Sequence, residues 1–159
     1  MTIQVGDKVP LANFNIMTPD GPQEINSGAV FDGKKVVLFA VPGAFTPGCS
    51  ITHLPGFVVK ADEIKAKGVD EIVCMAVNDA FVMGAWGQAQ NAEEILMLAD
   101  GNGEFTKAIG LELDAKGFGM GFRAKRFGMI VDDGTVIHLA VEAPGEIKVS
   151  TADAMIELL

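Results

Sequence analysis

Cys49 is the residue of this chain whose type and surroundings most strongly indicate chemistry. It lies in the segment VPGAFTPGCSITH, residues 41–53, which joins a strand-like apolar run to a helical pattern. A helix N-terminus carries free N–H donors and a positive partial charge, and both favour a thiolate over a thiol. We therefore expect Cys49 to occupy the first turn of a helix as a reactive nucleophile.

A reactive cysteine needs more than ionisation. An ordinary cysteine is about 3% ionised at neutral pH, so complete ionisation gains only about thirty-fold, or ~2 kcal/mol. Larger accelerations require fixed donors that stabilise charge developing on a departing atom. The Thr46 hydroxyl, a loop amide and a guanidinium are the candidate donors, and Arg123 and Arg126 lie in FRAKRF just before a predicted strand. Arginine stays charged when partly desolvated, which suits it to this role.

The spacing Pro42-x3-Thr46-x2-Cys49 resembles the active-site pattern of the peroxiredoxins. The longer segments VPGAFTPGCSITHLPGF, VNDAFVMGAWG and RAKRF are similar to the type II, or peroxiredoxin-five, subfamily, and the likeness runs from Val5 to the last helix. The resemblance implies a thiol-dependent peroxidase whose substrates are hydrogen peroxide and organic hydroperoxides. It also implies that Cys49 attacks the peroxide and becomes a sulfenic acid, with no metal or organic cofactor.

The resemblance assigns roles to the matched positions. Thr46 donates to the peroxide and orients it, Pro42 shields the thiolate, and Arg126 stabilises both the thiolate and the transition state. Three further residues are candidates for substrate contact: Gly48 through backbone donors, Phe45 as part of an apolar rim with Trp86, and His53. Aromatic residues at the spacing of Phe45 and Trp86 more often belong to the core. His53 lies four residues after Cys49 and can share its helix face, although a structural histidine bonded to the backbone fits the sequence equally well.

Cys74 is the second of two cysteines, and its surroundings differ from those of Cys49. It lies inside EIVCMAV, a predicted buried strand, so a bond to Cys49 would require substantial local unfolding. The residues after Ala143, where some relatives carry a resolving cysteine, include none. We therefore expect Cys74 to be a buried packing residue and only secondarily a resolving cysteine. An external thiol then resolves the sulfenic acid, and the resemblance suggests glutathione with glutaredoxin, or thioredoxin.

The elements that must position these residues follow from the apolar runs and turn signals. They predict an α/β chain with a central mixed sheet and helices on both faces, the thioredoxin-like arrangement, although other doubly wound folds share the pattern. Pro55-Gly56 is expected to kink the first long helix. The predicted strands are residues 35–41, 71–77, 95–99, 127–131 and 135–142; the predicted helices are residues 50–67, 81–91 behind an Asn78-Asp79 cap, about 105–110, and a last one from Ser150 or Thr151.

Length and composition limit the remaining possibilities. A chain of 159 residues with 49% hydrophobic residues and no repeat or polar linker is expected to form one domain over residues 1–159. The net charge of −9 repels phosphate backbones and anionic membranes, so neither nucleic acid nor a membrane is an expected partner. The absence of a signal-like N-terminus and the presence of only two cysteines favour the cytoplasm.

Other kinds of protein could use the same residues. A redox sensor would use the thiolate of Cys49 without turnover. A thiol–disulfide oxidoreductase normally carries Cys-x-x-Cys, whereas the site here is Pro47-Gly-Cys49-Ser50. A zinc module would have to combine both cysteines with both histidines, which lack paired-ligand spacing. Family resemblance further suggests a homodimer, for which the apolar side chains Phe45, Phe81 and Trp86 are available.

Overall fold

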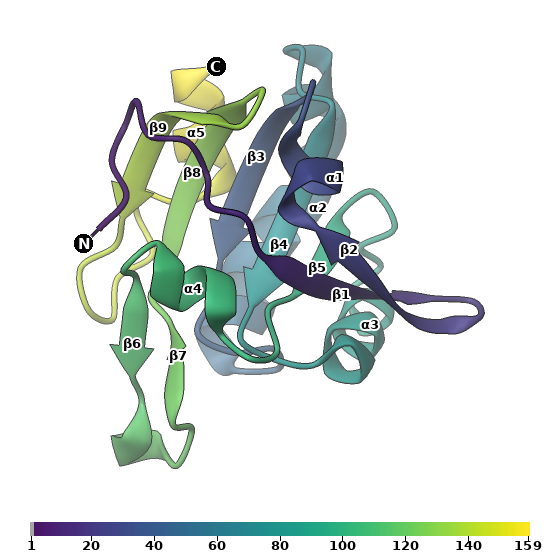
Figure 1. Cartoon of the computed structure of the whole chain (residues 1–159), viewed down its shortest axis with the longest axis vertical. Helices are drawn as coiled ribbons and strands as arrows, with labels where there is room; N and C mark the ends of the chain where they lie inside the picture. Colours follow the sequence, from purple (N-terminus) through teal and green to yellow (C-terminus); the bar gives the residue numbers. More distant parts are fainter. Residues whose placement is uncertain (1) are drawn as a thin grey trace.

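Short apolar strands alternate with helices along the chain, as the sequence predicts (Figure 1). This computed structural model describes residues 2–159. The strands are β1 (Asn13–Thr18), β2 (Gly21–Asn26), β3 (Lys35–Ala40), β4 (Glu71–Ala76), β5 (Leu96–Ala99), β6 (Glu112–Asp114), β7 (Phe122–Ala124), β8 (Phe127–Asp132) and β9 (Thr135–Val141). The helices are α1 (Ser27–Phe31), η1 (Cys49–His53), α2 (Leu54–Ala66), α3 (Ala80–Ala89), α4 (Glu104–Ala108), η2 (Lys116–Phe118) and α5 (Ala152–Leu158).

One mixed sheet organises the molecule. Its seven strands lie in the order β2-β1-β5-β4-β3-β8-β9, with β3, β4 and β5 parallel and their outer neighbours antiparallel. The strands β3 and β4 are buried from their second residue to their last, as expected of strands covered on both faces. The prediction of a mixed sheet between helices is confirmed.

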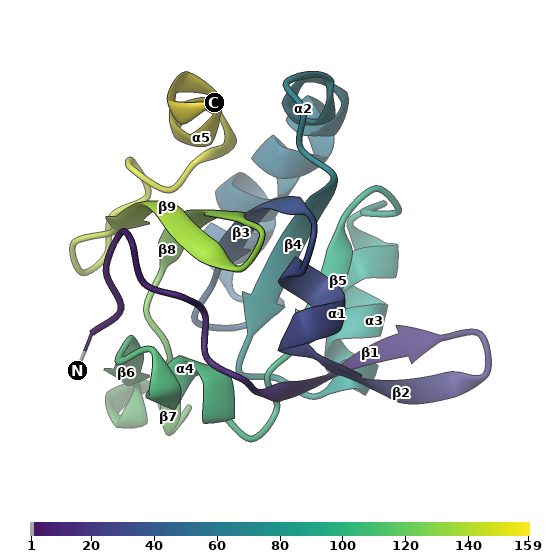
Figure 2. The same ribbon diagram turned by 45° about the horizontal axis from the view of Figure 1, so that its top comes forward.

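Two apolar layers hold the helices against the sheet. One layer combines Phe39 and Cys74 of the sheet with residues of α2, α3 and α5; the other combines Leu38 and Met75 with residues of α1 and α4. Figure 2 shows the helices distributed over both faces in this way. Within residues 2–159 no helix has both the length and the apolar character needed to cross a bilayer.

Strand register brings distant parts of the sequence to one edge of the sheet. Parallel strands β3, β4 and β5 end there, at Ala40, Ala76 and Ala99. Ala40 pairs with Phe127, the first residue of β8, and Phe127 pairs in turn with Val141, the last residue of β9. The residues just outside these pairs therefore lie beside the loop that follows β3. Ligands of open α/β sheets bind at such an edge.

The helix that follows this loop begins with a widened turn. Residues Cys49–His53 form a π-helix, in which the Leu54 amide donates to the Cys49 carbonyl, and α2 continues from Leu54. Pro55 explains the irregularity, because a proline has no N–H and its ring collides with the carbonyl four residues earlier in an α-helix. The sequence predicted a kink at Pro55-Gly56. In the structure the irregularity lies one turn earlier, in the π-helix that begins at Cys49.

Several elements were not predicted from the sequence. The hairpin β1–β2 and the helix α1 precede the first predicted strand, and the pair β6–β7 projects from the body of the molecule (Figure 1). Their apolar residues are few: β2 is mostly exposed, and β6 has no buried residue. A short, half-exposed strand lacks the alternation on which sequence interpretation depends.

Two helix glycines should respond oppositely to alanine. A Cβ added at Gly84 of α3 would lie 2.7 Å from Cβ of Met17 in β1, so the strand must move, whereas one at Gly56 of α2 would meet nothing within 4 Å. We expect Gly84→Ala to lower the free energy of unfolding by about 1–3 kcal/mol. Gly56→Ala should raise it by up to about 1 kcal/mol through helix propensity. Urea unfolding of both variants measures these changes, and a loss at Gly56 with no loss at Gly84 would contradict the packing described for α3.

Candidate active site

Cys49 lies at the carboxyl edge of the sheet, at the start of the π-helix. The loop of residues 41–48 carries the chain there from β3, and the Cys49 side chain has no exposed surface. Residues that surround it in the sequence are only partly buried, including Thr46 and Gly48. The thiol therefore belongs to the buried core, while the loop residues next to it in the sequence remain partly accessible.

Two side chains donate hydrogen bonds to the sulfur of Cys49. Thr46 Oγ1 lies 2.9 Å from Sγ, and Arg126 Nη2 lies 3.1 Å from it. Thr46 stands three residues before Cys49, the offset at which a side chain at a helix start reaches the third residue of the helix. Arg126 arrives from the opposite direction, because it immediately precedes β8, which pairs with β3. Both donors favour the anionic form of the sulfur.

The Thr46 hydroxyl has two acceptors for one proton. Besides Sγ, its Oγ1 contacts the carbonyl oxygen of Gly43 at 2.7 Å. When Cys49 is a thiol, S–H can donate to Oγ1 while the hydroxyl donates to Gly43; when it is a thiolate, the hydroxyl can turn to the sulfur. Thr46 can thus follow a change of charge at Cys49 without moving its oxygen.

His53 holds the other side of the Arg126 guanidinium. Arg126 Nη1 lies 2.7 Å from His53 Nδ1. An arginine nitrogen only donates, so Nδ1 accepts and the ring proton is on Nε2, which donates to the Ser150 carbonyl at 2.8 Å. His53 is therefore a neutral ring that positions Arg126. It does not itself contact the sulfur in the hydrogen-bond pattern, which favours the structural interpretation over a direct substrate contact.

The surroundings of His53 keep it neutral. The ring is 1% exposed and packs against Phe39 and Phe57, with centroid distances of 4.9 and 5.7 Å. Burial lowers the pKa of His53 to about 4, with the positive charge of Arg126 adding to the effect and the bond to the Ser150 carbonyl opposing it. Protonation would remove the acceptor for Arg126 and place two cations in contact.

The remaining loop residues shape the approach to the sulfur. A Cβ at Gly48 would lie 3.4 Å from Arg126 Nη2 and 3.1 Å from Ile147, so glycine allows the guanidinium to lie close to the backbone. Phe45 is 55% exposed and adopts a positive φ of 64°, which is costly for a bulky side chain. A hydrogen bond fixes the loop at the residue before Phe45: the Ala44 amide donates to Asn78 Oδ1 at 2.9 Å.

Arg123 contacts backbone carbonyls, including one in the loop before Cys49, and makes no hydrogen bond to the sulfur. Its Nε donates to the Met120 carbonyl at 2.9 Å, and its Nη1 makes a longer contact of 3.4 Å with the Pro42 carbonyl. Of the two arginines suggested by the sequence, the structure therefore places only Arg126 on Cys49. Arg123 instead braces Pro42 from the projecting β6–β7 pair.

Trp86 belongs to the core, the more common of the two positions that the sequence allowed, and not to an exposed rim. It is fully buried in α3 and donates from Nε1 to Ser50 Oγ at 3.0 Å. Its ring also lies 6.5 Å from that of Phe45. The expectation that Trp86 is available for an interface is wrong, because the whole indole is used to pack the π-helix against α3. Phe45 and Phe81 are exposed, at 55% and 65%.

Cys74 lies in the interior of β4, as expected. It pairs with Phe39 of β3 and Met97 of β5, has no exposed surface, and both cysteines are free. Burial, together with the nearby Cys49, raises the pKa of the Cys74 thiol well above its usual value, while Arg126 opposes the effect. Cys74 is thus held as an unreactive thiol within the sheet.

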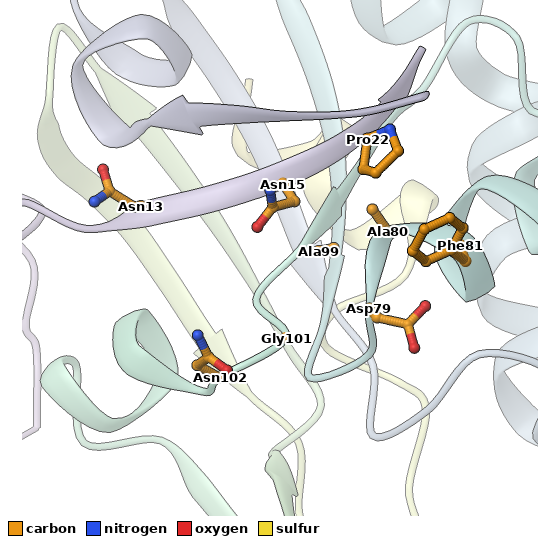
Figure 3. Close-up of a pocket in the computed structure, with 9 residues that line it drawn as sticks. All are labelled: Asn13, Asn15, Pro22, Asp79, Ala80, Phe81, Ala99, Gly101 and Asn102. Carbon is orange, nitrogen blue, oxygen red and sulfur yellow. The ribbon is translucent and has the colours of Figure 1, made fainter. Parts of the chain in front are cut away.

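A pocket of about 340 Å³ opens beside this edge, between β1, β5 and the start of α3 (Figure 3). It contains neither Cys49 nor either of its donors, and Asp79 on its wall caps α3 by accepting from the Val82 amide. Among residues 2–159 there is also no group of three or more His, Cys, Asp or Glu side chains that could hold a metal ion.

Sequence reasoning missed two buried residues behind His53. Ser150 is fully buried and Glu142 is 8% exposed; they are bonded to each other and reach Cys49 through His53 and Arg126. Neither belongs to a local motif with Cys49. The one available signal was the hairpin β8–β9, which places Glu142 opposite Arg126, so that the Glu142 amide donates to the Arg126 carbonyl at 3.0 Å.

The lowered pKa of His53 has a consequence for stability. Because the folded pKa is about 4 and the unfolded value about 6.5, the unfolded chain binds more protons between these values, so stability falls as pH falls from 6.5 to 4. Lowering the pH from 7 to 5 should remove about 2 kcal/mol of unfolding free energy through His53. Urea unfolding at pH 7 and pH 5 measures this decrease in the free energy of unfolding. The decrease should be smaller by about 2 kcal/mol in His53→Gln and unchanged in His138→Gln on β9. An unchanged pH difference in His53→Gln would contradict this assignment.

Comparison with known proteins agrees with this geometry. The Redoxin family matches residues 4–156. Peroxiredoxin-2D of Arabidopsis thaliana is 46% identical over 159 residues, which cover 99% of this chain and 98% of that protein. The structure of reduced Prx3 from Vibrio vulnificus in complex with H2O2 is 55% identical, with a TM-score of 0.96 over 99% of both chains. Peroxiredoxin 5 from Alvinella pompejana is 37% identical, with a TM-score of 0.86 over 98% of this chain and 96% of that one.

These matches extend over almost the whole chain, and they include the sheet edge on which Cys49, Thr46 and Arg126 meet. The resemblance inferred from PGAFTPGC and RAKRF is therefore confirmed along the full length of the fold. The chain belongs to the type II peroxiredoxins of the thioredoxin-like superfamily and is a thiol-dependent peroxidase.

Proposed function

We propose that Cys49 is the peroxidatic residue of this peroxidase and that an external thiol completes its cycle. The observation that carries the proposal is the pair of hydrogen bonds on Sγ, from Thr46 at 2.9 Å and from Arg126 at 3.1 Å. Charged or strongly polar donors on a buried sulfur make sense where a thiolate must persist in low dielectric. Cys74, equally buried, has an apolar environment instead.

The first step transfers one oxygen. The Cys49 thiolate attacks one peroxide oxygen, a sulfur–oxygen bond forms, and the O–O bond breaks with its electron pair leaving on the second oxygen. The sulfur is oxidised to a sulfenic acid, which keeps the attacked oxygen, and the second oxygen leaves as hydroxide from hydrogen peroxide or as alkoxide from an alkyl hydroperoxide. The leaving hydroxide or alkoxide takes up a proton, from solvent or from the attacked oxygen, and becomes water or an alcohol.

Thr46 and Arg126 are the donors placed to stabilise that step. As electrons leave the sulfur, negative charge moves from Sγ onto the departing oxygen. Both donors already converge on Sγ, so a peroxide bound against the sulfur would lie within their reach. Gly48 leaves room beside Arg126 Nη2. The family resemblance assigns to the half-buried Pro42 the role of shielding the thiolate. Phe45, exposed at the rim, would contact the alkyl group of an organic hydroperoxide.

The second half of the cycle consumes two equivalents of thiol. A thiol attacks the sulfenic sulfur and expels water, which leaves a mixed disulfide on Cys49, and a second thiol then releases the cysteine as thiolate. The burial of Cys74 in β4, hydrogen-bonded between two neighbours, argues against its use as the first thiol. Glutathione with glutaredoxin is the reductant we favour, with thioredoxin as the alternative.

We further propose that the protein is a homodimer that works in a reducing compartment, the cytoplasm. Phe45 and Phe81 expose large apolar surfaces near the loop that carries Cys49, and a second copy would cover them. A cycle that depends on an external thiol needs a compartment in which thiols stay reduced.

One equivalent of hydrogen peroxide should add one oxygen to the protein mass, because Cys49 has no partner with which to form a disulfide. Addition of glutathione should replace that oxygen by a glutathione adduct. Intact-protein mass spectrometry of the wild type and of Cys74→Ser should give the same two products. Cys49→Ser, the matched control, should show neither. Loss of two hydrogens from the wild type would contradict resolution by an external thiol and would bring Cys74 into the cycle.

A further inference from the structure

Glu142 is a buried carboxylate without an ion pair among residues 2–159. It is 8% exposed, and its Oε2 accepts from the Lys148 amide at 2.7 Å, the Ser150 amide at 2.8 Å and the Ser150 hydroxyl at 2.6 Å. The second oxygen, Oε1, is buried with no hydrogen-bond partner. Burial raises the pKa of Glu142, but the hydrogen bonds from Ser150 and Lys148 lower it by more, so the group is ionised at neutral pH. Burying a charged group costs free energy, and among the described residues no group of opposite charge pairs with Glu142 to offset that cost.

The three hydrogen bonds fold the segment of residues 142–151, here called the C-terminal loop, onto Glu142. The loop lacks regular structure from the end of β9 to the start of α5. Backbone amides of Lys148 and Ser150 therefore donate to the Glu142 carboxylate and not to a neighbouring strand. Its effect is to fix the position of Ser150, which is fully buried beside Gly128 of β8. A Cβ at Gly128 would approach the Ser150 Cα to 3.3 Å, which shows how closely the loop is packed.

The fixed Ser150 is the start of a continuous path to the sulfur. Its carbonyl accepts from His53 Nε2, so it sets both the tautomer and the orientation of that ring. His53 Nδ1 then accepts from Arg126 Nη1, and Arg126 Nη2 donates to Cys49 Sγ. Each contact along this path is 3.1 Å or shorter, at 2.8, 2.7 and 3.1 Å. The guanidinium is planar, so the position of Nη1 decides where Nη2 lies.

We propose that Glu142 is a positioning residue for peroxide reduction, acting through Ser150 and His53 on the guanidinium of Arg126. The proposal rests on the role proposed above for Arg126. It assigns a function to the C-terminal loop, which carries no residue in contact with the sulfur. It also gives the charged side chain a role at this buried position, since a carboxylate accepts three hydrogen bonds on one oxygen better than an amide does.

Glu142→Gln tests the proposal, because it keeps the shape of the side chain and removes its charge. We expect the rate constant for oxidation by hydrogen peroxide to fall roughly ten- to hundred-fold, as for a misplaced catalytic group. Alkylation by iodoacetamide at alkaline pH, which needs the thiolate and not a bound peroxide, should change less than about two-fold. Stopped-flow fluorescence can follow the oxidation, because Trp86 is the single tryptophan and contacts Ser50 beside Cys49.

Glu146→Gln is the matched control. It removes the same charge from the same loop, but Glu146 meets only the exposed amine of Lys148, at 3.4 Å. Both rates should stay within about two-fold of the wild type. Ser150→Ala removes one of the three bonds to Glu142 and a longer contact of the hydroxyl with His53 Nε2 at 3.4 Å, but it keeps the carbonyl that His53 uses at 2.8 Å. It should therefore slow oxidation less than Glu142→Gln and in the same direction. This second variant also tests the proposal if Glu142→Gln does not fold.

A double-mutant cycle separates positioning from a general loosening of the structure. If Glu142 acts through Arg126, Glu142→Gln should have little further effect on oxidation in an Arg126→Lys background. Equal slowing of oxidation and alkylation by Glu142→Gln would overturn the proposal, and so would a full additional loss in the Arg126→Lys background or an unchanged oxidation rate. Failure of the wild type itself to react with hydrogen peroxide would instead refute the role proposed for Cys49.

Discussion

The guanidinium of Arg126 is the group on which the arrangement of this site depends. One of its amines donates to Cys49 Sγ at 3.1 Å, and the other donates to His53 at 2.7 Å. Because the group is planar and permanently charged, it can be fixed from one side and present its charge on the other. His53 can serve as the fixed point only while it is neutral, and its burial between aromatic rings keeps it so. The neutral His53 therefore holds the guanidinium so that the positive charge of Arg126 faces the sulfur of Cys49.

The sheet supplies this arrangement through register. Cys49 follows the parallel strand β3, and the antiparallel neighbour β8 starts opposite the last residue of β3, so Arg126 reaches the sulfur from 77 positions away in the sequence. The next strand, β9, ends opposite the start of β8 and leaves Glu142 bonded to the Arg126 backbone. The π-helix completes the site by placing Cys49 and His53 on one side of a widened turn. Only three adjacent strand ends and one helix start are needed.

The sequence predicted those parts of the site that depend on local pattern. Apolar runs predicted the central strands, and the helical pattern after the Pro/Gly-rich loop predicted a helix start at Cys49, since both follow from the chemistry of a few neighbouring residues. Arg126 was placed by its position before a strand together with the family resemblance. The sequence left Trp86 between a core position and an exposed one, because its burial depends on how α3 packs against the π-helix. Glu142 was missed for a similar reason: its bonds to Ser150 exist only after an irregular loop has folded.

The account depends most on the claim that donors fixed on the sulfur make Cys49 react with peroxide, beyond making it a thiolate. Thr46→Val tests this claim directly, since valine keeps the shape of threonine and lacks the hydroxyl that lies 2.9 Å from Sγ. The measurement is the ratio of two rate constants at alkaline pH, oxidation by hydrogen peroxide and alkylation by iodoacetamide. We predict that oxidation falls by about a hundred-fold or more while alkylation changes only a few-fold. A parallel fall of both rates, or an unchanged oxidation rate, would contradict the account.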